Sequence, residues 1–281
     1  MRTTVTLDAD VRRILQDAMR QRGISFKQAL NDAVRAGLLP AGARRKRRFV
    51  QKTYSLGAEL LFPWDKALAT ADAIEDEEIL PQAMKLLLFS DIHNDWKRLE
   101  DLLSTEADLY IADGDQCTWN KGIERYGQIL ERRGDKVYVL PGNHEAADKI
   151  VEMCALHGLH YFHDGHLQLG RWHIAGLGYS NPTPFNTPSE YSEAQLAEHL
   201  QPFAPLAPLV LVCHAPPYGT ALDQVRPGLH AGSRSVLEFI EKHQPEYFFC
   251  GHIHEAEGAS IEIGRTRARN VGKAGYLLEL D

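Results

Sequence analysis

Several features are missing from the sequence, and each absence removes a class of protein. No run of about 18 apolar residues occurs in the 281-residue chain, so a membrane-spanning helix is not expected. Residues 1–6 are polar and lack the apolar core of a signal peptide, which predicts a cytoplasmic protein. The four cysteines form no C-x-x-C pair, which predicts reduced and mostly buried thiols. Internal repeats and low-complexity segments are absent as well.

Charge is distributed unevenly along the chain, although its net value is only -7. Residues 1–50 contain twelve Lys or Arg and four Asp or Glu, a surplus of eight positive charges. The remaining 231 residues therefore carry fifteen negative charges. A basic head on an acidic body predicts two units with different partners.

The first 40 residues have the pattern of a strand followed by two helices. Residues 3–7 alternate in the period of a strand, and Asp8 can cap a helix that Gly23 ends. Ser25 and Gln28 form a possible capping box for a second amphipathic helix. A segment of this size cannot bury a core alone, and pairing of two copies would solve that problem.

This order of elements resembles the ribbon-helix-helix family of bacterial repressors and antitoxins. In that family two strands pair across a two-fold axis, enter the DNA major groove and read bases. The resemblance implies a homodimer that binds DNA through the side chains facing away from the core, which here are Arg2, Thr4 and Thr6. The alternative is a helical hairpin that serves only for dimerisation.

Residues 41–83 contain a basic run and then an acidic helical stretch. The run at 44–48 has two interpretations, a solvated linker or a segment that contacts phosphate groups. The stretch that leads through residues 75–78 resembles the tail with which such antitoxins wrap a toxin. Here Pro81 and a new domain follow, so toxin binding is in question.

From Met84 onward, apolar strands alternate with helical segments, which predicts a layered α/β domain over residues 84–281. Residues 159–179 and 259–281 alternate apolar and polar side chains and predict antiparallel ribbons. The expected buried strands are 86–89, 109–112, 137–140, 209–212 and 247–250.

Each of these five strands leads into a cluster of polar side chains. Strand ends of a layered α/β sheet converge on one edge, where ligands usually bind. The clusters supply the side chains Asp91, His93, Asp113, Asp115, Asn143, His144, His214, His252 and His254.

The donor types in these clusters suit a transition-metal centre. Alternate residues of an extended segment reach neighbouring space, so Asp91 with His93 and His252 with His254 can each supply two ligands. Mixed nitrogen and carboxylate donors suit Mn, Fe, Zn or Ni better than calcium. The donors exceed what one ion needs, so two divalent ions are expected, and a carboxylate such as Asp115 can bridge them.

The five blocks resemble, in order, those of the calcineurin-like metallophosphoesterase superfamily. They read D-x-H at 91–93, G-D at 114–115, G-N-H-E at 142–145, a single His at 214 and G-H-x-H at 251–254. The resemblance implies a four-layer α/β/β/α sandwich with two sheets between helices. It assigns one metal to Asp91, His93, Asp115 and His254, and the other to Asp115, Asn143, His214 and His252.

The same resemblance implies a phosphoester hydrolase in which a metal-bridging hydroxide attacks in line. His144 would be the catalytic group that is not a ligand, and Glu145 or Asp95 is expected to support it. By the family pattern Asp115, and not Asp113, is the bridge. His230 is expected to touch the substrate because it lies in the segment after His214.

The blocks H-A-P-P-Y-G at 214–219, Asp223, Gly232-Ser233 and the run up to Gly258 resemble the subgroup of small cyclic-nucleotide-type phosphodiesterases. We therefore expect a phosphodiesterase acting on a small or nucleotide phosphodiester. The alternatives are a phosphomonoesterase acting on a protein or a small molecule, and a nuclease or DNA-associated regulator targeted by the N-terminal segment. Further candidates for substrate contact are Tyr179, Asn181, Tyr218, Asp223 and Arg226.

Overall fold

The computed structural model describes residues 9–38 and 83–281. Contacts along the chain separate two units, residues 1–67 and 68–281. The strand predicted at 3–7, with Arg2, Thr4 and Thr6, lies outside the described residues, as do the basic run and the acidic stretch. No helix in the described part is long and apolar enough to cross a membrane.

The first unit contains the two predicted helices, α1 (Ala9–Arg22) and α2 (Phe26–Leu38). Gly23 makes the turn between them with φ +62°, a conformation that glycine adopts without strain. The Ser25 hydroxyl accepts a hydrogen bond from the Gln28 N–H at 3.4 Å, as expected of an N-cap. The helices bury Leu15 and Ala29 but leave other large apolar side chains exposed, namely Val11, Ile14, Phe26 and Val34.

The second unit begins at β1 (Met84–Phe89), which lies inside a five-stranded sheet of order β13-β1-β2-β3-β4. Residues Leu86 to Phe89 are all buried because this strand has apolar material on both faces. Strands β1, β2, β3 and β4 are parallel, and β13 is antiparallel to β1. The other bounds are β2 (Leu109–Asp113), β3 (Val137–Leu140), β4 (His160–Tyr161) and β13 (Tyr276–Leu280).

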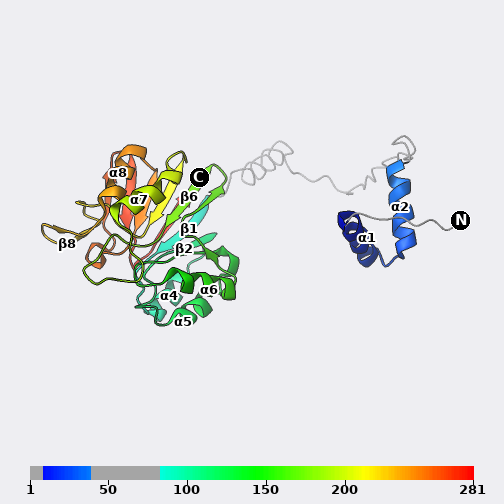
Figure 1. Cartoon of the computed structure of the whole chain (residues 1–281), viewed down its shortest axis with the longest axis horizontal. Helices are drawn as coiled ribbons and strands as arrows, with labels where there is room; N and C mark the ends of the chain where they lie inside the picture. Colours follow the sequence, from blue (N-terminus) through cyan, green and yellow to red (C-terminus); the bar gives the residue numbers. More distant parts are fainter. Residues whose placement is uncertain (1–8, 39–82) are drawn as a thin grey trace, which may run out of the picture. The chain divides into compact units, whose positions relative to one another are not determined.

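A second sheet of six strands has the order β11-β12-β10-β7-β6-β5. Its four central strands are parallel, while β5 and β11 form antiparallel edges. A separate hairpin of β8 and β9 follows β7 (Figure 1). The bounds are β5 (Gly165–Leu169), β6 (Trp172–Leu177), β7 (Leu209–Cys213), β8 (Gln224–Arg226), β9 (Leu229–His230), β10 (Tyr247–Cys250), β11 (Ser260–Ile263) and β12 (Thr266–Asn270).

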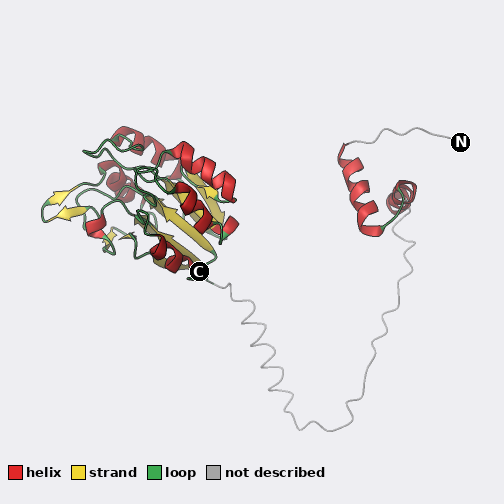
Figure 2. Ribbon diagram, turned by 90° about the horizontal axis from the view of Figure 1, so that it is seen from below, coloured by secondary structure: helices red, strands yellow, loops and turns green. Residues whose placement is uncertain are grey.

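Helices cover the outer faces of both sheets, so that strands lie between groups of helices (Figure 2). Helices α4 (Trp96–Leu103), α5 (Ile123–Leu130) and α6 (Ala147–His157) cover the first sheet, and α7 (Glu193–Leu200) and α8 (Arg234–His243) cover the second. Short 3-10 turns are η2 (Gly134–Lys136), η3 (Gln201–Phe203) and η4 (His254–Ala256).

Three apolar clusters hold these layers together. One lies between the first sheet and its helices, and another between the second sheet and its helices. The third lies between the sheets, where Leu86 and Leu88 meet Val210, Val212 and Phe249. Each fully buried Leu or Phe contributes about 1.5–3 kcal/mol relative to exposure. The expected α/β/β/α order is therefore confirmed.

The C-terminal ribbon differs from the expectation. Residues 259–281 were expected to form one ribbon, but only β11 and β12 pair with each other. Strand β13 leaves that sheet and pairs with β1 of the other sheet, where Leu278 and Leu280 become buried. Burial of these two leucines in the central cluster accounts for the change of sheet. All four cysteines are buried free thiols, as expected.

Candidate metal centre

The polar clusters that follow five strands meet at one edge of the molecule. Three of them follow the parallel strands β1, β2 and β3 of the first sheet, and two follow β7 and β10 of the second. Because parallel strands end at the same edge, the topology brings all five loops together. Three groups of side chains there place candidate ligand atoms within 4.8 Å of one another: Asp91, His93, His254; His93, Asp115, His144; and Asp115, His214, His252.

The backbone at this edge is held in an uncommon conformation. Asp91, His93, Asp115 and His252 have φ values of 54°, 46°, 52° and 70°, in the left-handed region. Such residues cost free energy unless their surroundings determine them, and they cluster at functional sites. A Cβ on Gly251 would collide with Ser90 and Asp91, so the loop after β10 can approach this closely only with glycine there.

The first group lies at the more exposed end of the site. The Nε2 atoms of His93 and His254 are 2.9 Å apart, and His254 Nε2 is 3.6 Å from Asp91 Oδ1. The Asp91 carboxylate accepts the His252 N–H at 3.0 Å, which joins the loops after β1 and β10. Burial lowers the pKa of His93 to about 4, so its ring is neutral and offers a lone pair at neutral pH.

The group of Asp115, His214 and His252 is more deeply buried. Asp115 Oδ2 is 3.4 Å from His214 Nε2 and 3.8 Å from His93 Nε2, so one carboxylate oxygen faces both ends of the site. Burial lowers the pKa of His252 to about 4. Burial would also lower the pKa of His214, but Asp115 outweighs it and raises the pKa to about 10. A divalent cation at that nitrogen would replace the proton.

Two orphaned atoms test whether these residues fit a metal. His214 Nδ1 lies 2.7 Å from the Asp113 carbonyl and must donate to it, which leaves a buried Nε2 that faces Asp115 Oδ2 at 3.4 Å without a hydrogen bond. Asn143 Nδ2 donates to Thr187 Oγ1 at 3.1 Å, and its buried Oδ1 has no hydrogen-bond partner. Buried polar atoms are rarely left unpaired, and ligation by a cation would satisfy both. The donor set therefore fits divalent metal ions.

His144 lies beside the cluster. Its N–H donates to Asp115 Oδ1 at 2.9 Å, and its ring packs edge-on against His93 and Trp119 at 4.9 and 5.5 Å between centroids. The expected support of the ring by Glu145 or Asp95 is wrong, because both carboxylates accept backbone N–H groups instead. Asp95 caps α4 through the Arg98 N–H.

Glu145 has a role that the motif alone did not indicate. Its buried carboxylate accepts the N–H groups of Gly142 at 2.8 Å, Asp115 at 3.0 Å and Cys117 at 2.6 Å. It thereby joins the loop after β3 to the loop after β2. Backbone N–H groups occur at every residue except proline, so this role has no signature in the sequence.

Two other expected positions, Asp113 and His230, are not members of the three ligand groups. The Asp113 carboxyl is buried with no hydrogen bond to either oxygen, and burial raises its pKa well above the ordinary value. His230 Nδ1 pairs with Asp223 Oδ1 at 2.7 Å in β9. Its neighbours Leu229 and Ala231 line the cavity beside the metal centre, whereas His230 is not part of that lining.

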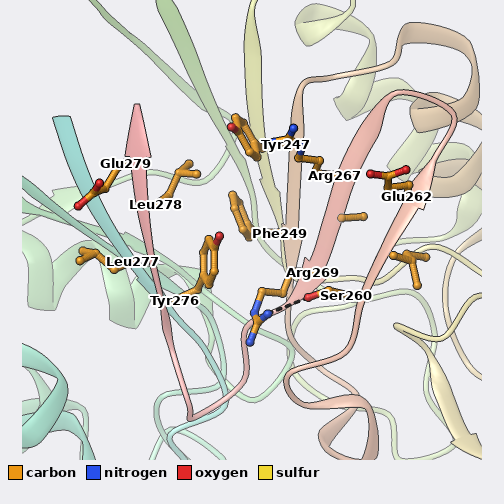
Figure 3. Close-up of a pocket in the computed structure, with 12 residues that line it drawn as sticks. Tyr247, Phe249, Ser260, Glu262, Arg267, Arg269, Tyr276, Leu277, Leu278 and Glu279 are labelled. Atoms are coloured by element: carbon orange, nitrogen blue, oxygen red, sulfur yellow. Dashed lines mark hydrogen bonds between the residues drawn. The ribbon is translucent and has the colours of Figure 1, made fainter. Parts of the chain in front are cut away.

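That cavity, of about 520 Å³, reaches Asp115, Asn143, His144, His252 and His254. Part of its wall comes from residues 182–185, which were not predicted from the sequence to line the site. The N-P-T-P-F pattern at 181–185, between the third and fourth blocks, was the signal that could have indicated this loop. A larger cavity of about 820 Å³ lies between β13 and the β10–β12–β11 edge, with Tyr247, Arg269 and Tyr276 in its wall (Figure 3). None of the predicted ligands lines it.

Two protein relatives cover the two parts of the chain. The Uncharacterized protein MJ1162 of Methanocaldococcus jannaschii is 32% identical over 202 residues, which span 69% of this chain and 91% of that protein. The Antitoxin VapB33 of Mycobacterium tuberculosis is 34% identical over 80 residues, 28% of this chain and 92% of that protein. The N-terminal part is thus similar to VapB antitoxins, as the ribbon-helix-helix pattern predicted.

Solved structures agree with the fold. The crystal structure of the protein TT1561 of Thermus thermophilus superimposes with a TM-score of 0.54 at 16% identity, covering 71% of this chain and all of that chain. At this identity the likeness concerns the fold alone. The family model described as calcineurin-like phosphoesterase matches residues 84–256. This match covers more than half of the chain and includes all five ligand-bearing loops, so the chain belongs to the calcineurin-like phosphoesterases and is a metallophosphoesterase.

Proposed function

We propose that the chain is a dinuclear-metal phosphodiesterase that hydrolyses a small phosphodiester. The observation that carries the proposal is the position of Asp115, one oxygen of which faces His93 on one side and His214 on the other. A shared carboxylate between two sets of nitrogen donors suits a pair of cations. Mn, Fe, Zn and Ni all suit this donor set.

Two divalent cations, when bound, lower the pKa of water and neutralise phosphate oxygens during in-line displacement. The chain's own residues supply the rest. Asp91, His93, Asp115 and His254 would hold one cation, and Asp115, Asn143, His214 and His252 the other. His144, held against Asp115 by its backbone N–H, would bind the phosphoryl group and protonate the leaving oxygen.

The test is hydrolysis of bis-p-nitrophenyl phosphate by the full chain with Mn²⁺. Asp115→Asn should lower kcat/KM by roughly 10²–10³ because the carboxylate shared by the two sets of nitrogen donors loses its charge. His144→Ala should lower it by roughly 10²–10⁴. Asp135→Asn, on the exposed surface of η2, is the control and should keep full activity. Hydrolysis that survives chelation of the metal, or that is unchanged in Asp115→Asn, would contradict the proposal.

Comparison with p-nitrophenyl phosphate separates a diesterase from a monoesterase. The proposal expects a higher kcat/KM for the diester, because the subgroup motifs at 214–219 and 251–255 favour that class. A higher kcat/KM for the monoester would replace the phosphodiesterase by a phosphomonoesterase and leave the metal centre intact.

The N-terminal unit supports a second activity. Similarity to VapB33 over 80 residues and the exposed apolar side chains of α1 and α2 favour a homodimer that binds DNA through Arg2, Thr4 and Thr6. A DNA-binding unit of this kind implies a cytoplasmic protein. The N-terminal unit would then bind DNA, and the second unit would bind the phosphoester substrate.

A further inference from the structure

The cavity beside the metal centre has one polar wall and one apolar wall. The polar wall is the cluster of ligands with His144. The apolar wall comes from two segments far apart in sequence, the loop at 182–185 and the hairpin of β8 and β9. Its apolar members are Pro182, Pro184, Phe185, Val225, Leu229 and Ala231.

Two of these apolar side chains are exposed at the rim of the cavity. Phe185 is 72% exposed and Leu229 is 43% exposed, although both lie next to a buried polar cluster. An apolar surface next to a site of chemistry marks a place where a ligand covers it. Burial of such surface against a ligand contributes about 25 cal/mol per Å².

The charge of the cavity lining further restricts the class of ligand that can bind. Among the described residues, its lining includes no Lys or Arg, and Glu255 adds a negative charge at its edge. Cations at the ligand cluster would therefore be the main positive charges available to a phosphoryl group. A second phosphate on the substrate would meet apolar side chains and a carboxylate, without a partner.

The apolar wall is held in place before any ligand binds. The buried Asp223 carboxylate accepts the N–H groups of Gly219 at 3.0 Å, Thr220 at 2.9 Å and Gly232 at 2.9 Å, and pairs with His230. These bonds fix both ends of the hairpin segment. A wall organised in advance loses little entropy when a ligand covers it.

The two segments of the wall are also joined to each other and to the metal ligands. Asn181 Nδ2 donates to the Ala231 carbonyl at 3.0 Å, which ties the 182–185 loop to the hairpin. Asn143, a ligand candidate, donates to Thr187 in the same loop at 3.1 Å. Hydrogen bonds therefore link the apolar wall to the metal centre.

We propose that this cavity selects a substrate whose phosphoryl group carries one uncharged apolar or aromatic ester group, with Phe185 and Leu229 as the specificity-determining residues. The inference rests on the proposed function and names the substrate class for it. A cavity of about 520 Å³ accommodates a group of the size of a substituted ring or a nucleoside. In the part of the chain that the structure describes, the cavity has no cationic wall that could bind the additional phosphates of a polyphosphate or a polynucleotide.

The test uses two inhibitors that differ only in the apolar group. Phenylphosphonate and methylphosphonate are titrated calorimetrically into the full-length protein loaded with Mn²⁺. The wild-type protein should bind phenylphosphonate about tenfold more tightly, because the ring covers Phe185 and Leu229. Equal affinities would overturn the proposal.

Two substitutions locate the preference. Phe185→Ala and Leu229→Ala should each reduce the tenfold preference to about threefold or less, since each removes part of the apolar surface. Leu156→Ala is the matched control, because Leu156 is 74% exposed on α6 and does not line this cavity. It should keep the preference of the wild type. An unchanged preference in both cavity variants would overturn the assignment of the wall.

These experiments distinguish failure of the apolar subsite from failure of the proposed function. A protein that prefers phenylphosphonate in a manner dependent on Phe185, yet hydrolyses no phosphoester, would disprove the phosphodiesterase and support the apolar subsite. A protein that hydrolyses bis-p-nitrophenyl phosphate but binds both phosphonates equally would support the enzyme and disprove the subsite.

Discussion

Glu145 shows how a residue outside the ligand groups can organise a candidate metal centre through backbone hydrogen bonds. Its carboxylate accepts three backbone N–H groups from the two loops that carry Asp115 and Asn143. All three donors are buried here, and a buried N–H that loses its acceptor costs free energy. The relative position of Asp115 and Asn143 therefore depends on this one side chain.

We predict that Glu145→Gln lowers Mn²⁺ affinity and kcat by about 10–100-fold, as loss of an outer-shell contact does elsewhere. The amide would turn an NH₂ group toward a backbone N–H, and one donor would lose its acceptor. Calorimetric titration of Mn²⁺ and steady-state hydrolysis measure the two effects separately. Glu152→Gln on the exposed face of α6 is the matched control and should change neither. Normal Mn²⁺ affinity in Glu145→Gln would contradict this role.

The candidate ligands could be predicted individually from sequence because each directly follows a buried strand. Asp91, Asp115 and His214 occupy such positions, and parallel topology brings them together. Phe185 could not be predicted, since its place in the cavity depends on how a long loop folds back beside Asn143. The expectation for Glu145 was wrong in its partner, because backbone N–H groups leave no trace in the residue pattern.

At the scale of elements, helix α8 depends on a carboxylate from helix α7. The first turn of α8 contains no acidic residue of its own. Glu193 accepts the N–H groups of Arg234 at 3.2 Å and Ser235 at 2.9 Å, and the Ser233 hydroxyl accepts that of Val236 at 3.2 Å. Three of the four free donors at this helix end are thereby satisfied by side chains.

These bonds also set the charge state of Glu193. Partial burial raises the pKa of this carboxyl, but hydrogen bonds from Ser235, Ser233 and Arg234 outweigh it, and the pKa lies below its ordinary value. A group with a lowered pKa in the folded state stabilises the protein above its unfolded pKa, about 4.3 for Glu. That stabilisation is lost as the pH falls through the folded-state pKa.

We therefore predict that Glu193→Gln lowers the free energy of unfolding at pH 7 by about 1–2 kcal/mol. The difference from wild type should shrink as the pH falls below about 4.3, because protonation removes the charge that the variant lacks. Urea unfolding of metal-free protein at several pH values measures it. Glu198→Gln, on the exposed face of α7, is the control. A difference that grows toward acid pH would contradict the prediction.

The order of strands and helices followed from sequence because the apolar runs are long and clearly bounded. The strand with which the last strand pairs could not be predicted in this way. The run at 276–280 alternates like the ribbon before it, and pairing β13 with β12 or with β1 satisfies the same pattern. Only the fit of Leu278 and Leu280 into the cluster between the sheets distinguishes the two, and that fit involves residues distant in the chain, such as Leu86 and Val210.

At the scale of the whole molecule, the two units differ in the size of the apolar core that each contains. The second unit contains three apolar clusters of its own. In the described part of the first unit, only Leu15 and Ala29 are buried apolar residues, whereas Ile14 is 63% exposed and Val34 is 47% exposed. Two helices with so small a core gain stability when a second copy covers the exposed apolar face.

We predict that the full chain is a dimer of twice 31.6 kDa by light scattering, and that Ile14→Glu converts it to a monomer. A charged side chain on the exposed face of α1 would have to be desolvated in the dimer. Salt-dependent DNA binding should weaken in the same variant by about tenfold or more, since one copy makes half of the phosphate contacts.

Hydrolysis of bis-p-nitrophenyl phosphate by the Ile14→Glu variant should stay within about twofold of wild type, because the metal centre is built entirely from residues 91–254. Leu156→Glu, an exposed leucine of the second unit, should leave the dimer intact. A monomeric wild-type chain, or an Ile14→Glu variant that remains dimeric, would show that this face of α1 does not pair two copies.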